Sequence, residues 1–329
     1  MKAVRIHALG DRSAVSVDDI PEPSAGPGEV VVDLAAATIN YPDILMLDGK
    51  YQIRPDLPYV LGKDASGTIS AVGDGVTEFA VGERVMFYVH YGAFAEKVAV
   101  PVTNCFKIPN DMPFNDAAAM GIAFQTVWAA LVDRAALKSG EVVLITGAAG
   151  GVGLAGVALA KALGASAVLA GLTTMSKADA VTAAGADHII DMSGDDLRDS
   201  VREQVRQATG GRDADVVLDV VGGDIFDACL RAIAFNGRIV VLGFMGGRIA
   251  DVKTNYLLLK NISVVGSSIN AIYARDNESV HRGQAEMTRL YREGKLAPHI
   301  HQCFPLDKIA EAIAVVEDRS IIGKVVLEI

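Results

Sequence analysis

Cysteine and aromatic residues are scarce in this chain of 329 residues, which has a single tryptophan and 6% aromatic residues. The cysteines, Cys105, Cys229 and Cys303, are odd in number and far apart, so neither a disulfide framework nor a CxxC metal motif is available. The chain is 51% hydrophobic and 21% charged, which excludes disorder as its main state. The length favours two domains over one.

Positive charge is also in short supply. The chain carries 30 Lys plus Arg against 40 Asp plus Glu, a formal net charge of -10. A surface of that sign opposes broad binding of nucleic acid or of an anionic membrane, while leaving room for a local basic pocket. We therefore expect no nucleic-acid partner and no membrane association.

One long run without charge, Val142–Ala160, invites a membrane interpretation. Its composition argues against a membrane span, because β-branched residues come first, then a glycine cluster, then small residues. That order predicts a buried strand, a turn and a helix. The opening segment MKAVRIHALG alternates like a strand and has no long apolar core of a signal peptide. We expect a soluble cytoplasmic protein.

The predicted pattern of secondary structure changes near residue 125. Before it, short strands separated by Gly and Pro predict an irregular, mostly antiparallel β domain. After it, short apolar runs alternate with helical segments; the predicted strands are Val142–Thr146, Ala167–Ala170, His188–Ile190, Asp215–Val220, Arg238–Leu242 and Ile262–Val265. This alternation predicts an α/β, doubly wound parallel sheet of the Rossmann type. The closing strand, Lys324–Ile329, is expected to return to the first domain.

A glycine-rich turn follows the first of these strands and opens a helix. Gly150 would let the backbone approach a pyrophosphate, which the helix N-terminus stabilises, and Gly153 would let helix and strand pack closely. Ala149, Gly151 and Val152 complete the candidate binding turn. The pattern lacks one glycine of the usual dinucleotide motif, so alone it could mark a tightly packed turn. The alternating strands around it favour a dinucleotide site.

An acidic residue is missing at the end of the second predicted strand, where NAD-binding folds tend to hold the ribose diol. The residues that follow instead are hydroxyl donors and a cation: Thr173, Thr174, Ser176 and Lys177. Such a set suits a 2′-phosphate and predicts NADPH over NADH. The pattern alone leaves open that Lys177 is a solvated residue at a helix start.

Short motifs recur along nearly the whole chain: Asn40–Asp43 (NYPD), Leu61–Gly67 (LGKDASG), Val81–Val85 (VGERV), Gly92–Glu96 (GAFAE), Ala148–Leu154 (AAGGVGL), Val221–Gly223 (VGG), Val241–Phe244 (VLGF) and Gly323–Val326 (GKVV). Together they resemble the medium-chain dehydrogenase/reductase superfamily, in the zinc-free quinone oxidoreductase branch that includes zeta-crystallin. The resemblance implies a GroES-like domain from residues 1–124 and 266–329, and an inserted Rossmann domain from residues 125–265. It also implies NADPH use and a homodimer along the Rossmann sheet edge.

The resemblance assigns roles to individual residues. It implies that Asn40 and Asp43 lie beside the nicotinamide, that Tyr51 lies on the substrate side, and that Thr126 contacts the cofactor amide. Further cofactor-binding positions are Val221, Gly243, Phe244 and Lys324. As alternatives, Asn40 and Asp43 could cap or brace a turn, and Tyr51 could be an ordinary interface aromatic.

Several residues differ from those at the same positions in relatives, and these differences bear on the predicted metal and cofactor. Zinc-dependent relatives carry Cys where this chain has Asn40 and His in the segment where it has Lys63, and only Cys105 remains where structural zinc would need four cysteines. We therefore predict no metal. Lys63 could stabilise a developing oxyanion, or could reach to solvent. Phe124 and Met192 replace tyrosines of relatives, and Met192 weakens the prediction of NADPH.

Without a zinc ion to stabilise an alkoxide, hydride delivery to a quinone or another electron-poor alkene is the better-matched chemistry. Two alternatives remain open. One is an enoyl-thioester reductase of the same superfamily. The other is a non-catalytic NADPH-binding protein with a structural or RNA-interacting role, although the net charge disfavours RNA.

Overall fold

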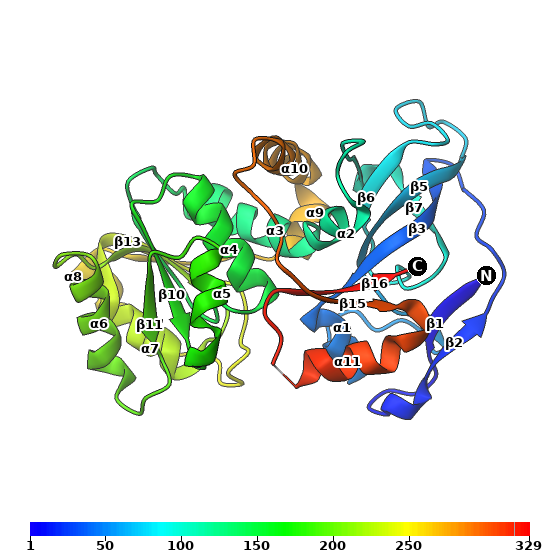
Figure 1. The fold of residues 1–329 in the computed structure, drawn as a ribbon. Helices are drawn as coiled ribbons and strands as arrows, with labels where there is room; N and C mark the ends of the chain where they lie inside the picture. The colour runs from blue at the N-terminus through cyan, green and yellow to red at the C-terminus, as the bar shows by residue number, and fades with distance from the viewer. Residues whose placement is uncertain (319) are drawn as a thin grey trace. The chain divides into compact units, whose positions relative to one another are not determined.

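A computed structural model describes residues 1–318 and 320–329. The chain divides into two compact units, each considered by itself below: Met1–Ile122 together with Pro298–Ile329, and Ala123–Ala297. Figure 1 shows the path of the chain through their helices and strands.

Strands dominate the first unit. They are β1 (Lys2–Ile6), β2 (Val15–Asp19), β3 (Glu29–Ile39), β4 (Tyr59–Val60), β5 (Asp64–Val72), β6 (Arg84–Tyr88), β7 (Lys97–Pro101), β8 (Cys105–Lys107), β15 (Ile300–Pro305) and β16 (Lys324–Glu328). Its helices are α1 (Tyr41–Leu47), α2 (Phe114–Ala119) and α11 (Ile309–Glu317). One sheet has the order β15-β16-β3-β5-β6-β8, with β7 also paired to β3, and a smaller one has the order β2-β1-β4.

The long strand β3 is the centre of this unit. Its residues Val30, Val32 and Leu34 belong to the main apolar core, whereas Ala36 packs with Ala118 of α2 and Val326 of β16. The closing strand β16 pairs antiparallel with β3, as the sequence predicted for a chain end that returns to the first domain.

Strand register brings four polar positions to one end of the larger sheet. Thr38 of β3 lies opposite Asp64 of β5, and Asp64 lies opposite Tyr88 of β6. On the other side of β3, Val325 lies opposite Ile39, so the preceding Lys324 reaches the same sheet end. Polar side chains from distant parts of the sequence therefore meet there.

All strands of the second unit run parallel, in the order β11-β10-β9-β12-β13-β14. They are β9 (Val142–Ile145), β10 (Ala167–Leu172), β11 (His188–Asp191), β12 (Ala214–Asp219), β13 (Ile233–Val241) and β14 (Ser263–Gly266). Each matches one predicted strand, and the doubly wound prediction is confirmed. The chain moves outward from β9 to β11 and then crosses to β12, so the topological switch point lies between β9 and β12.

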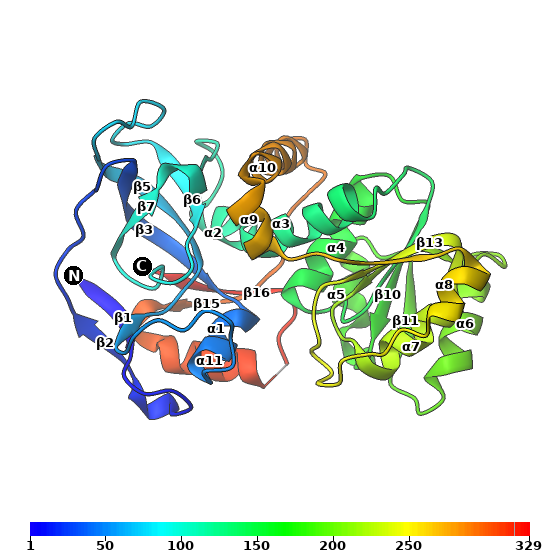
Figure 2. The same ribbon diagram turned by 180° about the vertical axis from the view of Figure 1, so that it is seen from behind.

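Helices cover both faces of this parallel sheet (Figures 1 and 2). On one face α4 (Gly151–Ala162) packs on β9 and β10, with α5 (Ala178–Ala183) beside it. On the other, Val201 and Val205 of α6 (Leu197–Ala208) join Phe226 of α7 (Gly223–Ala232) in one apolar core with Leu144 and Val217. The buried strands are apolar on both sides because both sides are covered.

Residues 266–297 belong to the second unit, whereas the sequence assigned them to the first domain. The segment forms α9 (Ile269–Arg275) and α10 (Asn277–Arg292), which hold the buried Gln125 of α3 (Ile122–Trp128). The Tyr273 hydroxyl donates to Gln125 Oε1 at 2.8 Å, and Gln125 Nε2 donates to Gln284 Oε1 at 3.1 Å. These contacts span distant positions, so periodicity could not reveal them.

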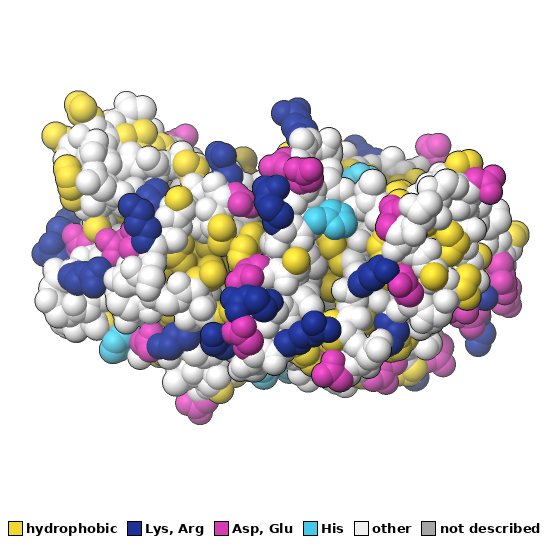
Figure 3. Space-filling model, turned by 90° about the horizontal axis from the view of Figure 1, so that it is seen from above, with side chains coloured by type: hydrophobic (Ala, Val, Ile, Leu, Met, Phe, Trp, Pro, Cys, Tyr) yellow, Lys and Arg dark blue, Asp and Glu magenta, His cyan; other side chains and the backbone are white. Residues whose placement is uncertain are grey.

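Acidic and basic side chains are interspersed on the face drawn in Figure 3. Within residues 1–318 and 320–329, no helix combines the length and the apolar character that crossing a bilayer requires.

Candidate active site

The carboxylate of Asp64 is the hub of a buried polar cluster in the first unit. Its Oδ1 accepts hydrogen bonds from Thr38 Oγ1 and from Asn40 Nδ2, each at 2.7 Å. Its Oδ2 accepts from the backbone N–H of Ile122 at 2.9 Å. Asp64 is buried, so these donors replace the water it loses on folding. One carboxylate thus joins the end of β3, the start of α1 and the start of α3.

Lys324 fixes the other end of the Asn40 side chain. Its Nζ donates to Asn40 Oδ1 at 2.5 Å and to the Ile39 carbonyl at 3.4 Å. Burial lowers the pKa of Lys324, and the negative charges of Asp64 and Asp43 oppose that shift. The Asn40 amide is held in a single orientation, oxygen toward Lys324 and nitrogen toward Asp64. Lys324, predicted as a cofactor contact, therefore lies buried as a brace for Asn40.

Asp43 lies in the first turn of α1 and is completely buried. Its Oδ2 accepts from the Asn40 backbone N–H at 2.8 Å, so the bracing role considered for this pair is present in the structure. Its Oδ1 is buried and has no hydrogen-bond partner among the described residues. Burial raises the pKa of Asp43 to about 7, although the positive charge of Lys63 acts to lower it. A carboxyl group that can change charge near neutral pH thus lies inside the cluster.

Lys63 is also completely buried, with 0% of its surface exposed. Its Nζ donates to the His90 carbonyl at 2.8 Å and lies 4.6 Å from the centroid of the Tyr51 ring. The alternative of a lysine that reaches solvent is therefore wrong, because the side chain is enclosed and its ammonium group donates to a backbone carbonyl. Burial lowers the pKa of Lys63, whereas Asp43 and Asp64 raise it.

The sequence interpretation missed two residues at the end of β6. The buried Tyr88 hydroxyl and Nδ1 of the exposed His90 are 3.0 Å apart. Partial burial of its ring lowers the pKa of His90, and the charge of Lys63 lowers it further, so both favour the neutral ring. Sequence alone did not indicate them, because Tyr88 reaches the cluster by lying opposite Asp64 in the sheet and His90 follows two residues later.

In the second unit, the glycine-rich turn joins β9 to α4. Leu154 N–H donates to the Gly150 carbonyl at 2.8 Å, so the N–H groups of Gly151, Val152 and Gly153 precede the helical ladder. A Cβ on Gly150 would meet only the Gly147 carbonyl oxygen, at 3.6 Å. A Cβ on Gly153 would lie 2.2 Å from that same oxygen, which no side chain tolerates. Gly153 provides the close packing that the sequence predicted, and Gly150 leaves open space at a helix N-terminus.

A second buried carboxylate fixes the neighbouring strand end. Asp219, the last residue of β12, accepts from Thr146 Oγ1 at 2.8 Å and from the Gly222 N–H at 3.1 Å. Thr146 Oγ1 in turn accepts from the Val220 N–H at 3.1 Å. Burial raises the pKa of Asp219, and these hydrogen bonds act to lower it. Sequence reasoning gave Asp219 no role, although it ends a buried strand at the switch point.

The remaining predicted cofactor residues of this unit follow strands whose carboxyl ends share one edge. The exposed Thr173, Thr174 and Ser176 and the half-buried Lys177 come after β10, Val221 comes after β12, and Gly243 and Phe244 come after β13. Thr126 lies on α3, and Met192 is buried in the core. The structure thus gathers the set along the edge where parallel sheets bind ligands, with Thr126 on a separate helix.

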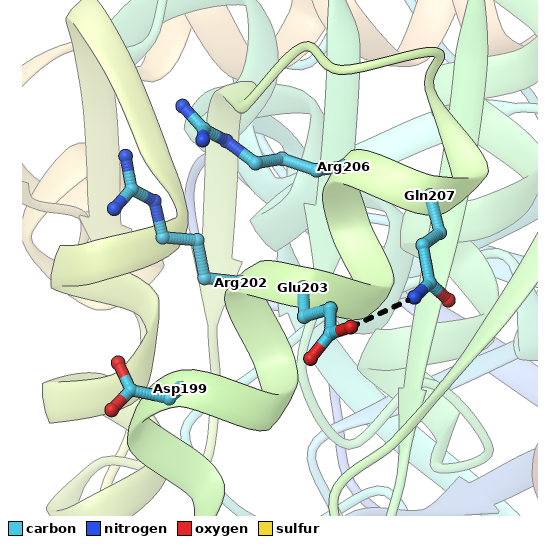
Figure 4. Close-up of a pocket in the computed structure, with 5 residues that line it drawn as sticks. All are labelled: Asp199, Arg202, Glu203, Arg206 and Gln207. Atoms are coloured by element: carbon cyan, nitrogen blue, oxygen red, sulfur yellow. Dashed lines mark hydrogen bonds between the residues drawn. The ribbon is translucent and has the colours of Figure 1, made fainter.

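A surface hollow on α6 contains none of the predicted catalytic or cofactor-binding residues. Figure 4 shows that Asp199, Arg202, Glu203, Arg206 and Gln207 line it, all from one helix. Arg206 Nε donates to Asp213 at 2.8 Å, and Arg202 forms a longer ion pair with the same residue. Among the described residues, no group of three or more His, Cys, Asp or Glu side chains is placed to hold a metal ion.

Two family models match the chain. Residues 26–110 match the alcohol dehydrogenase GroES-like domain, and residues 151–282 match the model described as zinc-binding dehydrogenase. The chain is 36% identical over 328 residues to the quinone oxidoreductase-like protein 2 homolog of Nematostella vectensis, covering 99% of this chain and 88% of the relative. It is 29% identical to the acryloyl-coenzyme A reductase of Sulfurisphaera tokodaii, with both chains covered completely.

Among solved structures, the fold is similar to that of the Escherichia coli quinone oxidoreductase complexed with NADPH. The TM-score is 0.90 at 28% sequence identity, with 100% of both chains covered. The similarity therefore extends over both units.

Replacing Asp43 by asparagine should change how stability depends on pH. Its carboxyl pKa is raised from 3.8 to about 7 on folding, so the wild-type protein loses stability as pH rises through that window. Asp43→Asn cannot ionise and should gain about 2–3 kcal/mol relative to wild type between about pH 5 and about pH 8. Urea unfolding at both pH values measures this difference. Asp111→Asn, at an exposed position, is the control. The same pH dependence of unfolding free energy in both variants would contradict the raised pKa of Asp43.

Proposed function

Because the chain belongs to the quinone oxidoreductase branch of the medium-chain dehydrogenase/reductase superfamily, and is therefore an oxidoreductase, we propose that it reduces quinones or other electron-poor alkenes with NADPH. The observation that carries the cofactor assignment is the open space at Gly150 beside the first N–H groups of α4. A pyrophosphate fits there because neither a side chain nor a helical hydrogen bond competes for those donors.

The hydroxyl and ammonium groups after β10 are proposed to hold the 2′-phosphate. Thr173, Thr174 and Ser176 are exposed and offer hydrogen-bond donors, and Lys177 offers a positive charge. Ala149, Val221, Gly243 and Phe244 would line the rest of the dinucleotide site, and Thr126 would contact the nicotinamide amide. A bound reduced nicotinamide supplies the hydride.

In the first unit, the proposal gives Asn40 and Asp43 positions beside the nicotinamide and gives Tyr51 the substrate side. Asn40 is held by Asp64 and Lys324, so its orientation is set before substrate enters. Tyr51 is half-buried, and its hydroxyl is the group proposed to donate to a substrate oxygen. That hydrogen bond would stabilise the oxygen that becomes negative after hydride addition, while the buried Asn40 and Asp43 shape the site behind it.

The donor set of this cluster does not suit zinc. The Asn40 amide is engaged at both ends, and Lys63 places an ammonium group, which repels a cation, where zinc-dependent relatives carry a ligand. We therefore propose a reaction without metal. Elemental analysis of protein purified without metal affinity should find no stoichiometric zinc.

A second candidate function is the reduction of an enoyl thioester. It is favoured by the similarity over the whole chain to an acryloyl-coenzyme A reductase. Both candidates add hydride to an alkene conjugated to a carbonyl group, so they differ in the acceptor and not in the reacting atoms. A cytoplasmic location is part of the same proposal, since NADPH and such acceptors are available there.

The edge strand β14 supports a homodimer along the Rossmann sheet. It ends the sheet order, and α8 (Thr254–Lys260), which leads into it, exposes 82% of Leu258 and 74% of Leu259. An unpaired strand edge beside exposed leucines is suited to pairing with a second copy of the chain.

Replacing both leucines by glutamate should break this dimer. Light scattering should give the mass of two chains for wild type and of one chain for Leu258→Glu/Leu259→Glu, because burying two carboxylates in an apolar contact is unfavourable. Val81→Glu, at an exposed apolar position of the first unit, should leave the mass unchanged. A wild-type monomer, or a double variant that stays dimeric, would contradict this interface.

The two glycines of the turn should separate folding from cofactor binding. Gly153→Ala forces backbone atoms apart and should lower stability by about 3 kcal/mol. Gly150→Ala should change stability by about 1 kcal/mol or less, yet weaken NADPH binding by roughly tenfold or more, because its methyl group fills the phosphate space. Thermal unfolding and calorimetric titration measure the two effects. Unchanged NADPH affinity in Gly150→Ala would remove the turn from the cofactor site.

The proposed activity is tested by following NADPH oxidation with quinones, α,β-unsaturated ketones and enoyl thioesters, with NADH as the comparison. Turnover with NADPH is expected, and Lys177→Ala should reduce the preference for NADPH by about tenfold because it removes a charge from the 2′-phosphate. Lys138→Ala, at an exposed position, is the matched control. An unchanged NADPH-to-NADH ratio would contradict the role of Lys177. Tight binding of NADPH without oxidation by any acceptor would favour a non-catalytic binding protein.

A further inference from the structure

None of the roles proposed above explains the contact between Lys63 and Tyr51. The Lys63 ammonium lies 4.6 Å from the centre of the Tyr51 ring and is 0% exposed, whereas Tyr51 is half-buried. A ligand arriving from solvent can therefore touch Tyr51 but not Lys63. The direct stabilisation of an oxyanion by Lys63, which the sequence suggested, does not fit this arrangement. Any influence of Lys63 on a substrate must pass through another residue.

The surroundings of Lys63 fix the position of its ammonium group. The His90 carbonyl accepts a hydrogen bond from Lys63 Nζ at 2.8 Å, which holds the ammonium against the ring. Burial lowers the pKa of Lys63, and the charges of Asp43 of α1 and Asp64 of β5 oppose that shift. His90, which follows β6, interacts electrostatically with Lys63, and the Tyr88 hydroxyl lies 3.0 Å from Nδ1 of its ring. Lys324 of β16 interacts with the same two carboxylates.

A cation against an aromatic face is attracted to the electrons of the ring. The attraction is stronger when the ring carries negative charge, so a cation beside a phenol favours the phenolate and makes the hydroxyl a better proton donor. Burial strengthens the effect, because water does not screen the ammonium from the ring. The geometry of Lys63 and Tyr51 meets these conditions.

We propose that Lys63 is a positioning residue that acts through Tyr51, strengthening its phenol as the acid that protonates a substrate enolate. This proposal rests on the proposed function for its chemical step. Hydride addition to the β-carbon of an α,β-unsaturated carbonyl compound moves the alkene electron pair toward the oxygen and leaves an enolate. The Tyr51 O–H bond then breaks and its proton bonds to the enolate oxygen, which gives an enol. The enol tautomerises to the carbonyl product with a hydrogen from water on the α-carbon, and the phenolate regains a proton from water. The sum is one hydride and one proton added across the alkene.

The proposal selects a substrate class. An enolate is a strong base that must be protonated before the product is formed, so a positioned acid accelerates its formation. A hydroquinone anion is a weaker base, and water can protonate it after release. Lys63 and Tyr51 therefore favour conjugated ketones or thioesters over quinones.

Titration of the tyrosine itself tests the proposal without turnover. The absorbance change on phenolate formation is measured in wild type and in Tyr51→Phe, and the difference between the two titrations belongs to Tyr51. In Lys63→Met, compared with Lys63→Met/Tyr51→Phe, the midpoint should move about one pH unit higher, because the stabilising cation is gone. Lys63→Arg should keep the wild-type midpoint. An unchanged midpoint in Lys63→Met would overturn the proposal.

Kinetics supply the second readout. Lys63→Met should lower kcat with an enone by about tenfold, a larger loss than with a quinone, and shift the alkaline limb of its pH profile upward. In a Tyr51→Phe background, Lys63→Met should have no further effect on the enone. Equal losses for both acceptors, or additive losses in the double variant, would contradict the proposal. Lys50→Met, at an exposed lysine on the same segment, is the matched control.

Folding and function are separable in this design. If Lys63→Met does not fold, Lys63→Gln removes the charge, keeps a donor for the His90 carbonyl, and carries the same expected results. A midpoint shift in a protein that oxidises NADPH with no acceptor would defeat the proposed function while leaving the Lys63–Tyr51 coupling intact. Turnover with an unchanged midpoint would defeat the Lys63–Tyr51 coupling while leaving the proposed function intact.

Discussion

The buried carboxylate of Asp64 is the contact on which the site of the first unit depends. It receives Thr38, Asn40 and the backbone of Ile122, and through Asn40 it reaches Lys324 near the chain end. Loss of this acceptor would leave several donors buried without partners, each costing about 1–3 kcal/mol. The same contact gives Asn40 a single orientation. The stability of this cluster and the orientation of Asn40 therefore have one physical source.

The second unit uses the same device at its own strand ends. Asp219 joins Thr146 and Gly222, and so fixes the turns that follow β9 and β12, on either side of the switch point. In each unit, a carboxylate without solvent access holds irregular backbone in place by accepting several hydrogen bonds. The groups proposed to meet ligand are different ones: the open backbone at Gly150, the exposed hydroxyls after β10, and the half-buried Tyr51. Buried carboxylates in each unit thus hold backbone near the accessible groups proposed to meet ligand.

The parts predicted well from sequence are those governed by local rules. The six parallel strands follow from short apolar runs, and the close packing at Gly153 follows from its place in the turn after the first of them. The placement of residues 266–297 could not be predicted, because it depends on Gln125, far away in sequence. Asp64, Asp219, Tyr88 and His90 were missed for the same reason, since their roles come from strand register. The burial of Lys63 rules out the alternative that its side chain reaches solvent. The sequence could not predict this burial, because the residues that enclose Lys63 come from other parts of the chain.

The account centres on hydride delivery to a conjugated alkene, followed by protonation from the enzyme. The most direct measurement uses NADPH with deuterium at both hydrogen positions of nicotinamide C4, an α,β-unsaturated ketone as acceptor, and mass spectrometry with NMR of the product. The account predicts deuterium at the β-carbon and a solvent-derived hydrogen at the α-carbon, formed by protein without stoichiometric metal. Bound NADPH that transfers no deuterium to any conjugated ketone or thioester and reduces no quinone would contradict it.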